Sequence, residues 1–243
     1  MSQPFYHLLS DLSLSVAEMA ISQLPADAVL FPEEMRILEK AVEKRKREFS
    51  AGRMLARQAM EQLGLSPCAI GVGAHREPLW PEGIVGSITH CSSWCAAALG
   101  YDTAMKYVGI DVEDYENRTL SPNLVKSICV PEETRWLSTF GQQDAARLAM
   151  AVFSAKESLF KALFPVARSF LGFEGAQIVF SEPVGEQCTW RGVLRKDWGP
   201  FYENDEFNGG RCVFERPYVA TAFVVAQHWR PGKKKGEHSL CVC

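Results

Sequence analysis

Two long stretches of the chain carry apolar residues at helical spacing. In the first, residues 33–64, apolar side chains return every three or four positions along a strongly basic sequence. Ser50 or Gly52 is expected to break this stretch into two helices, and Gly64 is expected to lie just beyond the end of the second. The pattern therefore predicts a pair of helices in the N-terminal part of the chain.

The second stretch lies between residues 131 and 165. Pro131 followed by Glu132 and Glu133 is typical of a first helical turn. Asp144 is expected to be the N-cap of a longer helix that ends near Pro165. The apolar stripe of this helix consists of Leu148, Val152, Leu159 and Leu163. Such a stripe predicts a helix with one buried face.

Short runs of β-branched and apolar residues predict strands after each helical stretch. The expected strands are 85–89, 95–99, 107–113, 176–180, 189–194, 212–214 and 218–225. The order of helices, strands, helices and strands predicts an α+β fold with two halves of similar size. We expect an N-terminal half at residues 1–105, a C-terminal half at 106–230 and a solvated tail at 231–243.

The composition is that of a globular protein. The chain has 243 residues, of which 47% are hydrophobic and 23% are charged, with a formal net charge of -3. These values allow a buried core and argue against disorder and general nucleic-acid binding. The cysteines are scattered without a zinc-type spacing, so we expect free thiols. The N-terminus lacks the positive segment of a signal peptide, and no apolar run is long enough to span a membrane, so we expect a cytoplasmic protein.

Two acidic residues alternate with apolar residues in the third expected strand. Asp111 and Glu113 would face one side of this strand, with Ile110 and Val112 on the other. Adjacent carboxylates repel each other unless a positive charge lies between them, and Mg²⁺ is bound by one or two carboxylates together with substrate phosphates. A solvated acidic strand end would explain the same pair, and on its own the pair favours that simpler explanation.

Two further segments carry candidate chemistry. The sequence FSAKESLFK, residues 153–161, puts Glu157 and Lys161 on one helix face. Glu157 could be a third metal-binding carboxylate, and Lys156 or Lys161 could offset phosphate charge. An ordinary surface ion pair would explain the spacing equally well. In GSITHCSSW, residues 86–94, His90 follows a strand and precedes small hydroxyl residues, where it could bind a phosphate or cap a turn.

These three segments, in this order, resemble the 4′-phosphopantetheinyl transferase superfamily. GIDVE at 109–113 and FSAKESLFK at 153–161 are similar to the family's paired signature, G-I-D-x-E followed later by W/F-x-x-K-E-x-x-x-K. FSAGR at 49–53 and REPLWP at 76–81 are similar to the enterobactin synthase component D group of the monomeric, surfactin-synthetase type. Phe153 replaces the more usual Trp and Thr89 the more usual Ser, and both changes keep the character of the position.

The resemblance implies a fold of two similar halves related by a pseudo-two-fold axis, each a small sheet packed on a long helix, with coenzyme A between them. It implies transfer of the phosphopantetheine group of coenzyme A to a serine of an apo carrier protein, with release of 3′,5′-ADP. Glu157, Lys161 and Asp111 would be catalytic, and Asp111, Glu113 and Glu157 would hold Mg²⁺. Coenzyme A would be bound by Arg47, Arg53, Arg76, Thr89, His90, Lys156 and Lys161, with His90 at the 3′-phosphate.

The resemblance also implies a monomer, because both halves are in one chain. The partner would be a peptidyl, aryl or acyl carrier protein, with siderophore or other nonribosomal peptide synthesis as the expected pathway. Either Glu157 or a metal-bound water could accept the serine proton.

Two other functions remain possible on the residues alone. A Mg²⁺-dependent phosphate hydrolase would need no carrier protein, although the chain has no Walker A sequence. A non-catalytic module that binds coenzyme A or a carrier protein would not need Glu157.

Overall fold

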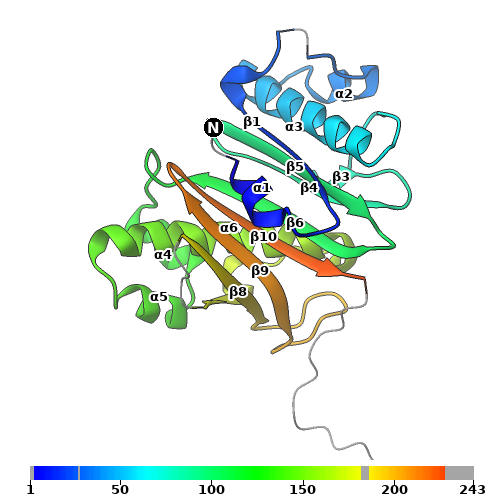
Figure 1. Ribbon diagram of the computed structural model, residues 1–243. Coiled ribbons are helices and arrows are strands. Elements are labelled where there is room, and N and C mark those ends of the chain that lie inside the picture. The colour runs from blue at the N-terminus through cyan, green and yellow to red at the C-terminus, as the bar shows by residue number, and fades with distance from the viewer. Residues whose placement is uncertain (1–2, 27, 182–185, 228–243) are drawn as a thin grey trace, which may run out of the picture.

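The computed structural model describes residues 3–26, 28–181 and 186–227. These residues form two main antiparallel sheets, each covered by a long helix (Figure 1). The first sheet has the order β1-β5-β4 and consists of β1 (Ser15–Ala20), β5 (Trp94–Tyr101) and β4 (Ile84–His90). The second has the order β6-β10-β9-β8-β7 and consists of β6 (Met105–Asp114), β10 (Tyr218–Ala226), β9 (Glu206–Glu215), β8 (Gln187–Leu194) and β7 (Ala176–Phe180). The expected α+β architecture is confirmed.

Helix α3 (Glu43–Gln62) packs on the first sheet and α6 (Gln142–Ala167) on the second. The buried face of α3 is rich in small side chains, so the helix can approach the strands closely. The buried face of α6 includes all four residues of the expected apolar stripe. Each long helix therefore covers its own sheet with the face that the sequence pattern indicates.

The remaining elements are short. They are α1 (Pro4–Leu9), η1 (Ile21–Gln23), α2 (Pro32–Ile37), β2 (Gly71–Val72), β3 (Pro78–Leu79), α4 (Pro122–Ile128), α5 (Pro131–Leu137) and η2 (Phe173–Gly175). The helix expected to begin at Pro131 is confirmed, and all seven expected strands are found, most of them longer than expected. The sequence did not predict α1, β1 or α4.

Two expected boundaries are wrong. The first helical stretch is broken between Ile37 and Glu43, whereas Ser50 and Gly52 lie inside α3. Gly52 is there for packing, because a Cβ on it would come within 2.9 Å of Ile88 on β4. The N-cap residue of α6 is Gly141 and not Asp144. The helix ends at Ala167, two residues from the expected end near Pro165. Gly64 has φ +78 and ends α3 as expected.

The two sheets meet where β4 lies beside β6. The hydroxyl of Ser87 accepts a hydrogen bond from the backbone N–H of Ile110 (3.1 Å), and that of Thr89 accepts one from Val112 (3.2 Å). Alternate hydroxyl side chains of β4 thus satisfy backbone donors of β6 that have no strand partner on that side. These bonds fix the register between the two halves.

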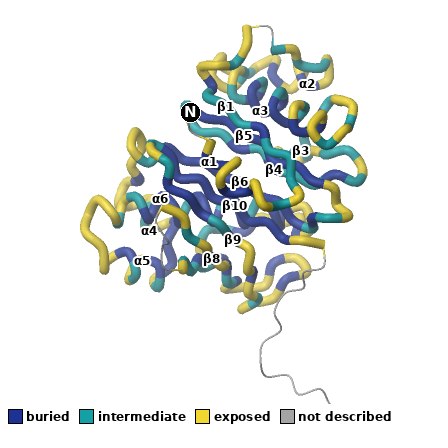
Figure 2. The backbone as a smooth tube through the Cα atoms, viewed as in Figure 1, coloured by how far each residue is buried: buried dark blue, intermediate teal, exposed yellow. Residues whose placement is uncertain are grey.

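A common core joins the halves on the face covered by α1. Phe5 and Leu9 of α1 pack in one cluster with residues of β5, β6 and β10, strands that are buried over most of their length (Figure 2). The boundary between residues 105 and 106 stays a prediction. The expected tail at 231–243 lies outside the described residues. Within the described part of the chain, no helix has the length and apolar character needed to cross a membrane.

Candidate active site at the junction of the two sheets

Asp111 and Glu113 point into the junction from β6, and Lys161 reaches them from α6. Lys161 Nζ lies 2.6 Å from Asp111 Oδ1 and 3.2 Å from the backbone carbonyl oxygen of Ile110. Thr89 Oγ1 donates a hydrogen bond to the same Asp111 oxygen at 3.2 Å. Two strands and one helix therefore converge on a single carboxylate.

Gly109 makes this convergence possible. A Cβ at this position would overlap the backbone carbonyl of Ser158 and lie 2.7 Å from the backbone nitrogen of Ala162. Because β6 has no side chain there, α6 can cross it at backbone contact. This crossing brings Lys161, on the next turn of α6, within reach of Asp111.

Glu113, Glu157 and Lys161 have pKa values raised above their ordinary values. Burial and then the neighbouring charge of Asp111 raise the pKa of Glu113 to about 7, although Arg118 hydrogen-bonds its Oε2 at 2.6 Å. Burial raises the pKa of Glu157, with Lys161 lowering it and Asp111 raising it. Burial alone would lower the pKa of Lys161, but Asp111 and Glu157 outweigh this and raise it. Perturbed pKa values of this kind cluster at functional sites.

The carboxylates fit a divalent cation in two respects. Asp111 Oδ2 is buried and has no hydrogen-bond partner, and Asp111 and Glu113 repel each other as the pKa of Glu113 shows. Both features would be relieved by Mg²⁺, which prefers carboxylate oxygens. Among the described residues, no three His, Cys, Asp or Glu side chains stand close enough together to form a complete metal site. Asp111 and Glu113 are therefore candidate ligands, and Glu157 is close enough to Asp111 for the two charges to interact.

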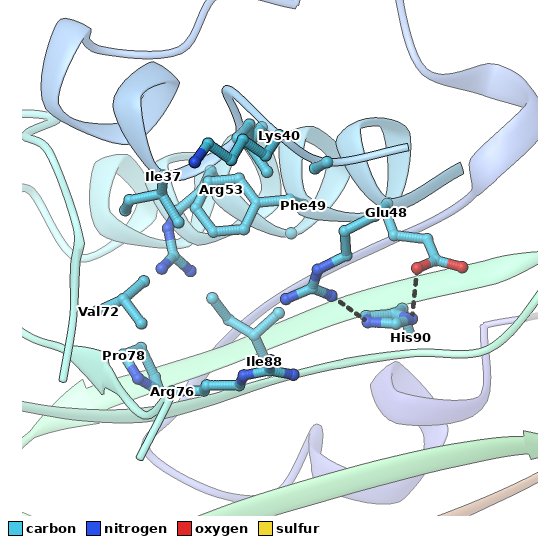
Figure 3. Close-up of a pocket in the computed structure, with 14 residues that line it drawn as sticks. Ile37, Lys40, Glu48, Phe49, Arg53, Val72, Arg76, Pro78, Ile88 and His90 are labelled. Carbon is cyan, nitrogen blue, oxygen red and sulfur yellow. Dashed lines mark hydrogen bonds and ion pairs between the residues drawn. The ribbon is translucent and has the colours of Figure 1, made fainter. Parts of the chain in front are cut away.

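A cation-rich cavity of about 510 Å³ lies beside this cluster, between α3 and β4 (Figure 3). Its ionisable lining residues are Lys40, Arg45, Glu48, Arg53, Arg76 and His90. Apolar side chains, Ile37, Val72 and Pro78, line the end away from His90 (Figure 3). Arg53 and Arg76 lie beside these apolar side chains, so cations line the cavity along its length (Figure 3). Cations together with an apolar wall suit a ligand that has both phosphate groups and an aromatic base.

Arg53 is held in this cavity by packing and by charge. Its guanidinium stacks 4.4 Å from the centre of the Phe49 ring, and its Nε lies 3.8 Å from the buried carboxylate of Glu34. Its buried Nε has no hydrogen-bond partner. Burial lowers the pKa of Arg53 to about 10, so it remains charged at neutral pH. Glu34 also binds Arg57 at 2.8 Å, and this joins α2 to α3.

Thr89 and His90 link the cavity to the carboxylate cluster. Thr89 is buried and faces Asp111, whereas the next residue, His90, faces the cavity. Burial, followed by the charges of Lys161, Arg45 and Lys44, lowers the pKa of His90 to about 4. The ligand-free imidazole is therefore neutral at pH 7, in an environment poised to accept an anion.

Two residues chosen from the sequence lie elsewhere. Lys156 Nζ donates to the backbone carbonyls of Ile128 (2.7 Å) and Phe173 (2.8 Å) and pairs with Glu133 at 2.8 Å. All three of its N–H donors are therefore occupied in the interior. Arg47 donates to the carbonyl of Ile21 at 3.3 Å and does not line the cavity. The structure does not bring either residue to the group around His90 and Asp111.

The structure adds Arg45 and Glu48, which the sequence did not single out. Both lie on the face of α3 that carries Phe49 and Arg53. Helical periodicity could have identified Arg45 as a cavity residue. Arg45 is eight residues before Arg53 and lies on the same helix face, whereas Arg47 is six residues before Arg53 and lies on another. The basic character of the whole segment hid this distinction.

Comparisons with known proteins identify the family. Residues 33–100 match the 4′-phosphopantetheinyl transferase N-terminal domain, and residues 107–213 match the 4′-phosphopantetheinyl transferase superfamily. The chain is 36% identical over 186 residues to 4′-phosphopantetheinyl transferase Npt of Nocardia iowensis, covering 76% of this chain and 82% of that protein. It is 37% identical over 208 residues to 4′-phosphopantetheinyl transferase PptT of Mycobacterium tuberculosis, covering 83% and 88%. Enterobactin synthase component D of Salmonella typhi is 36% identical over 141 residues, covering 58% of this chain and 57% of that protein.

Proposed function

The chain belongs to the 4′-phosphopantetheinyl transferase superfamily, and from this premise we propose how its own residues carry out the transfer. The enzyme moves the phosphopantetheine group of coenzyme A to a serine of an apo carrier protein. The observation that carries our assignment is the convergence of Lys161 and Thr89 on Asp111, beside a cavity that presents His90, Arg45 and Arg53.

Coenzyme A would lie along the junction of the two sheets. Its 3′-phosphate would be bound by His90 and Arg45, and Arg53 and Arg76 would offset further charge along the cavity. The adenine fits the apolar end of the cavity, near Val72. The pyrophosphate would then lie at Lys161, whose ammonium already faces the junction. Arginine is well suited to phosphate because its donors form a fixed fork.

Asp111, Glu113 and Glu157 would hold Mg²⁺ at the pyrophosphate. When bound, the ion would neutralise charge that develops on the phosphate oxygens during transfer. The unpartnered oxygen of Asp111 and the mutual repulsion of Asp111 and Glu113 support this assignment. Lys161 contributes a second positive charge from the protein itself.

The reaction needs a proton acceptor as well as charge stabilisation. The serine Oγ attacks the β-phosphorus of coenzyme A, a new P–O bond forms, and the bond from that phosphorus to the bridging oxygen breaks to release 3′,5′-ADP. Glu157 is our choice for the group that takes the serine proton, because its carboxylate is close enough to Lys161 and Asp111 to interact with their charges and so lies at the expected position of the pyrophosphate. Lys161 is placed to stabilise charge on the leaving pyrophosphate oxygen.

We also propose a class of carrier protein, an oligomeric state and a location for the enzyme. The likeness to enterobactin synthase component D favours a carrier protein of siderophore or other nonribosomal peptide synthesis. A monomer is favoured because α3, β4, β6 and α6 of one chain supply both the carboxylate cluster and the cavity. A reducing, cytoplasmic location fits the six described cysteines, all of which are free thiols.

Intact-mass analysis tests this function. An apo peptidyl carrier protein is incubated with the enzyme, coenzyme A and Mg²⁺, with EDTA in a parallel sample. A mass gain of one phosphopantetheine group that is lost with EDTA is the expected result. Coenzyme A breakdown without an acceptor would instead indicate a hydrolase.

The variant Glu157→Gln separates the transferase from a binding module. It should abolish most of the mass gain while the protein stays folded. Glu203→Gln, a change of an exposed glutamate far along the chain, is the control and should behave as wild type. Normal transfer by Glu157→Gln would contradict the role given to Glu157.

A further inference from the structure

His90 is held between a cation and a carboxylate that both come from α3. Arg45 Nη1 lies 3.2 Å from His90 Nε2, and Glu48 Oε2 lies 3.8 Å from His90 Nδ1 (Figure 3). Among the described residues that line the cavity, Glu48 alone is acidic. A carboxylate in a site for phosphate repels the ligand unless it serves another group there. The presence of Glu48 in this cavity therefore indicates that it interacts with another residue there.

The hydrogen bond from Arg45 defines how the imidazole of His90 is protonated. A guanidinium can only donate, so Nε2 must accept and carries no proton. A neutral imidazole then has its proton on Nδ1, which is the nitrogen that faces Glu48. Glu48 thus favours the tautomer that leaves Nε2 directed at Arg45 and the cavity.

We propose that Glu48 is a positioning residue for His90, which fixes the Nδ1–H tautomer and stabilises the imidazolium when a phosphate monoester dianion binds at Nε2. The proposal rests on the placement of the 3′-phosphate of coenzyme A at His90. On binding, Arg45 turns its donor from Nε2 to the phosphate, and Nε2 takes a proton from solvent and donates a hydrogen bond to the phosphate. Glu48 then faces a charged partner in place of a neutral one.

The charges around His90 support this sequence of events. From α3 it faces Lys44, Arg45 and Glu48, and from α6 it feels Lys161. In the free protein, burial followed by these cations lowers the pKa of His90 to about 4. A bound dianion cancels part of the cationic field, and Glu48 supplies a second negative charge at the opposite nitrogen. Binding near neutral pH should therefore be linked to proton uptake.

A positioning role for Glu48 and a purely electrostatic role predict opposite effects of a Glu48 variant on ligand binding. If Glu48 were only a nearby negative charge, Glu48→Gln would strengthen the binding of every anion in the cavity. If it positions His90, the same change should weaken ligands that carry a 3′-phosphate and spare those that do not. The two explanations therefore differ in sign.

Calorimetric titration of 3′,5′-ADP and 5′-AMP tests the proposal, in buffers of different ionisation enthalpy. Wild type should take up about one proton per 3′,5′-ADP at neutral pH. Glu48→Gln should bind 3′,5′-ADP at least about tenfold more weakly and lose the proton uptake, because the imidazolium that donates to the phosphate loses its counter-charge. Its affinity for 5′-AMP should stay the same or rise. Glu48→Asp should keep the proton uptake, and Glu61→Gln, on an exposed position of the same helix, should match wild type.

Nitrogen NMR of His90 gives a second test that needs no ligand. The free wild-type protein should show a proton on Nδ1 and a bare Nε2. The opposite tautomer, or unchanged or tighter binding of 3′,5′-ADP by Glu48→Gln, overturns the role of Glu48 and leaves the coenzyme placement standing. If 3′,5′-ADP does not alter the His90 signals of wild type, the placement of the 3′-phosphate is wrong and the proposal falls with it.

Discussion

The Cα of Gly109 on β6 lies against the backbone carbonyl of Ser158 on α6 so closely that a Cβ would overlap it. This contact sets the distance between the strand that carries Asp111 and the helix that carries Lys161. It gives the glycine of the G-I-D-x-E signature a physical role that is separate from ligand binding. The signature therefore combines a packing requirement with the two carboxylates that follow it.

Replacing Gly109 by alanine should damage both stability and activity. The added methyl group has to push α6 away from β6, and overpacking of this kind costs about 1–3 kcal/mol. The same shift would separate Lys161 from Asp111 and lower the rate of transfer. Chemical denaturation and the mass assay measure the two effects.

The control for this change is Gly141→Ala. Gly141 is the N-cap residue of α6, and a Cβ there would meet no atom within 4 Å. Its φ of -62 is open to any residue. This variant should transfer at the wild-type rate, and an equal loss in both variants would contradict the close crossing as the cause.

Arg45 and Arg47 make a matched pair for testing the coenzyme site. Arg45 contacts His90 in the cavity, whereas Arg47 bonds a backbone carbonyl outside it. Arg45→Gln should raise the KM for coenzyme A by about tenfold or more, the cost of a charged hydrogen bond. Arg47→Gln should leave the KM nearly unchanged. A larger rise in KM for Arg47→Gln than for Arg45→Gln would contradict this assignment and support Arg47 as a coenzyme A ligand, as the sequence predicted.

The sequence predicted those parts of the fold that depend on local patterns. The alternation in 107–113 predicted that Asp111 and Glu113 share a face, and they do. It did not reveal β1, whose residues become a strand through antiparallel pairing with β5, a long-range contact that local propensity does not encode. Ser50 and Gly52 predicted a helix break, yet the tertiary contact of Gly52 with Ile88 outweighs its low helix propensity.

In the candidate site, too, the sequence predicted the local pattern but not the contacts that depend on tertiary packing. Position in a motif cannot tell which way a side chain points, so Lys156 and Lys161, five residues apart on α6, were given similar roles. The structure buries one against Glu133 and directs the other at Asp111. Only the packing of α4, α5 and η2 around Lys156 decides this.

Lys156→Met should therefore lower the free energy of unfolding and have little direct effect on the binding of coenzyme A. Removing one partner of a buried ion pair leaves Glu133 uncompensated, which costs about 3–5 kcal/mol. A second change, Glu133→Gln, should recover part of this loss because no buried charge then remains. Denaturant unfolding measures both, with Lys126→Met at an exposed position of α4 as the control. A full-stability Lys156→Met protein with a raised KM for coenzyme A would instead support a phosphate contact.

The stability of the protein should depend on pH and on Mg²⁺ through Glu113. Because burial and Asp111 raise the pKa of Glu113 from its ordinary value of 4.5 to about 7, the folded protein binds this proton more tightly than the unfolded chain. The resulting contribution to the unfolding free energy is complete below the ordinary value and is lost as pH rises through about 7, by up to about 3 kcal/mol. Without metal, wild type should lose stability relative to Glu113→Gln across this window.

Mg²⁺ should reverse that loss, because it binds the ionised carboxylate in competition with the proton. The rise in Tm on adding Mg²⁺ should be larger above pH 7 than below pH 6, and Glu113→Gln should show little rise at either. Comparing the two proteins at each pH cancels the opposite effect of His90, whose lowered pKa makes the fold less stable as pH falls from 6.5 to about 4. An equal Mg²⁺-induced rise in both proteins at all pH values would mean that Glu113 is not a ligand of the ion.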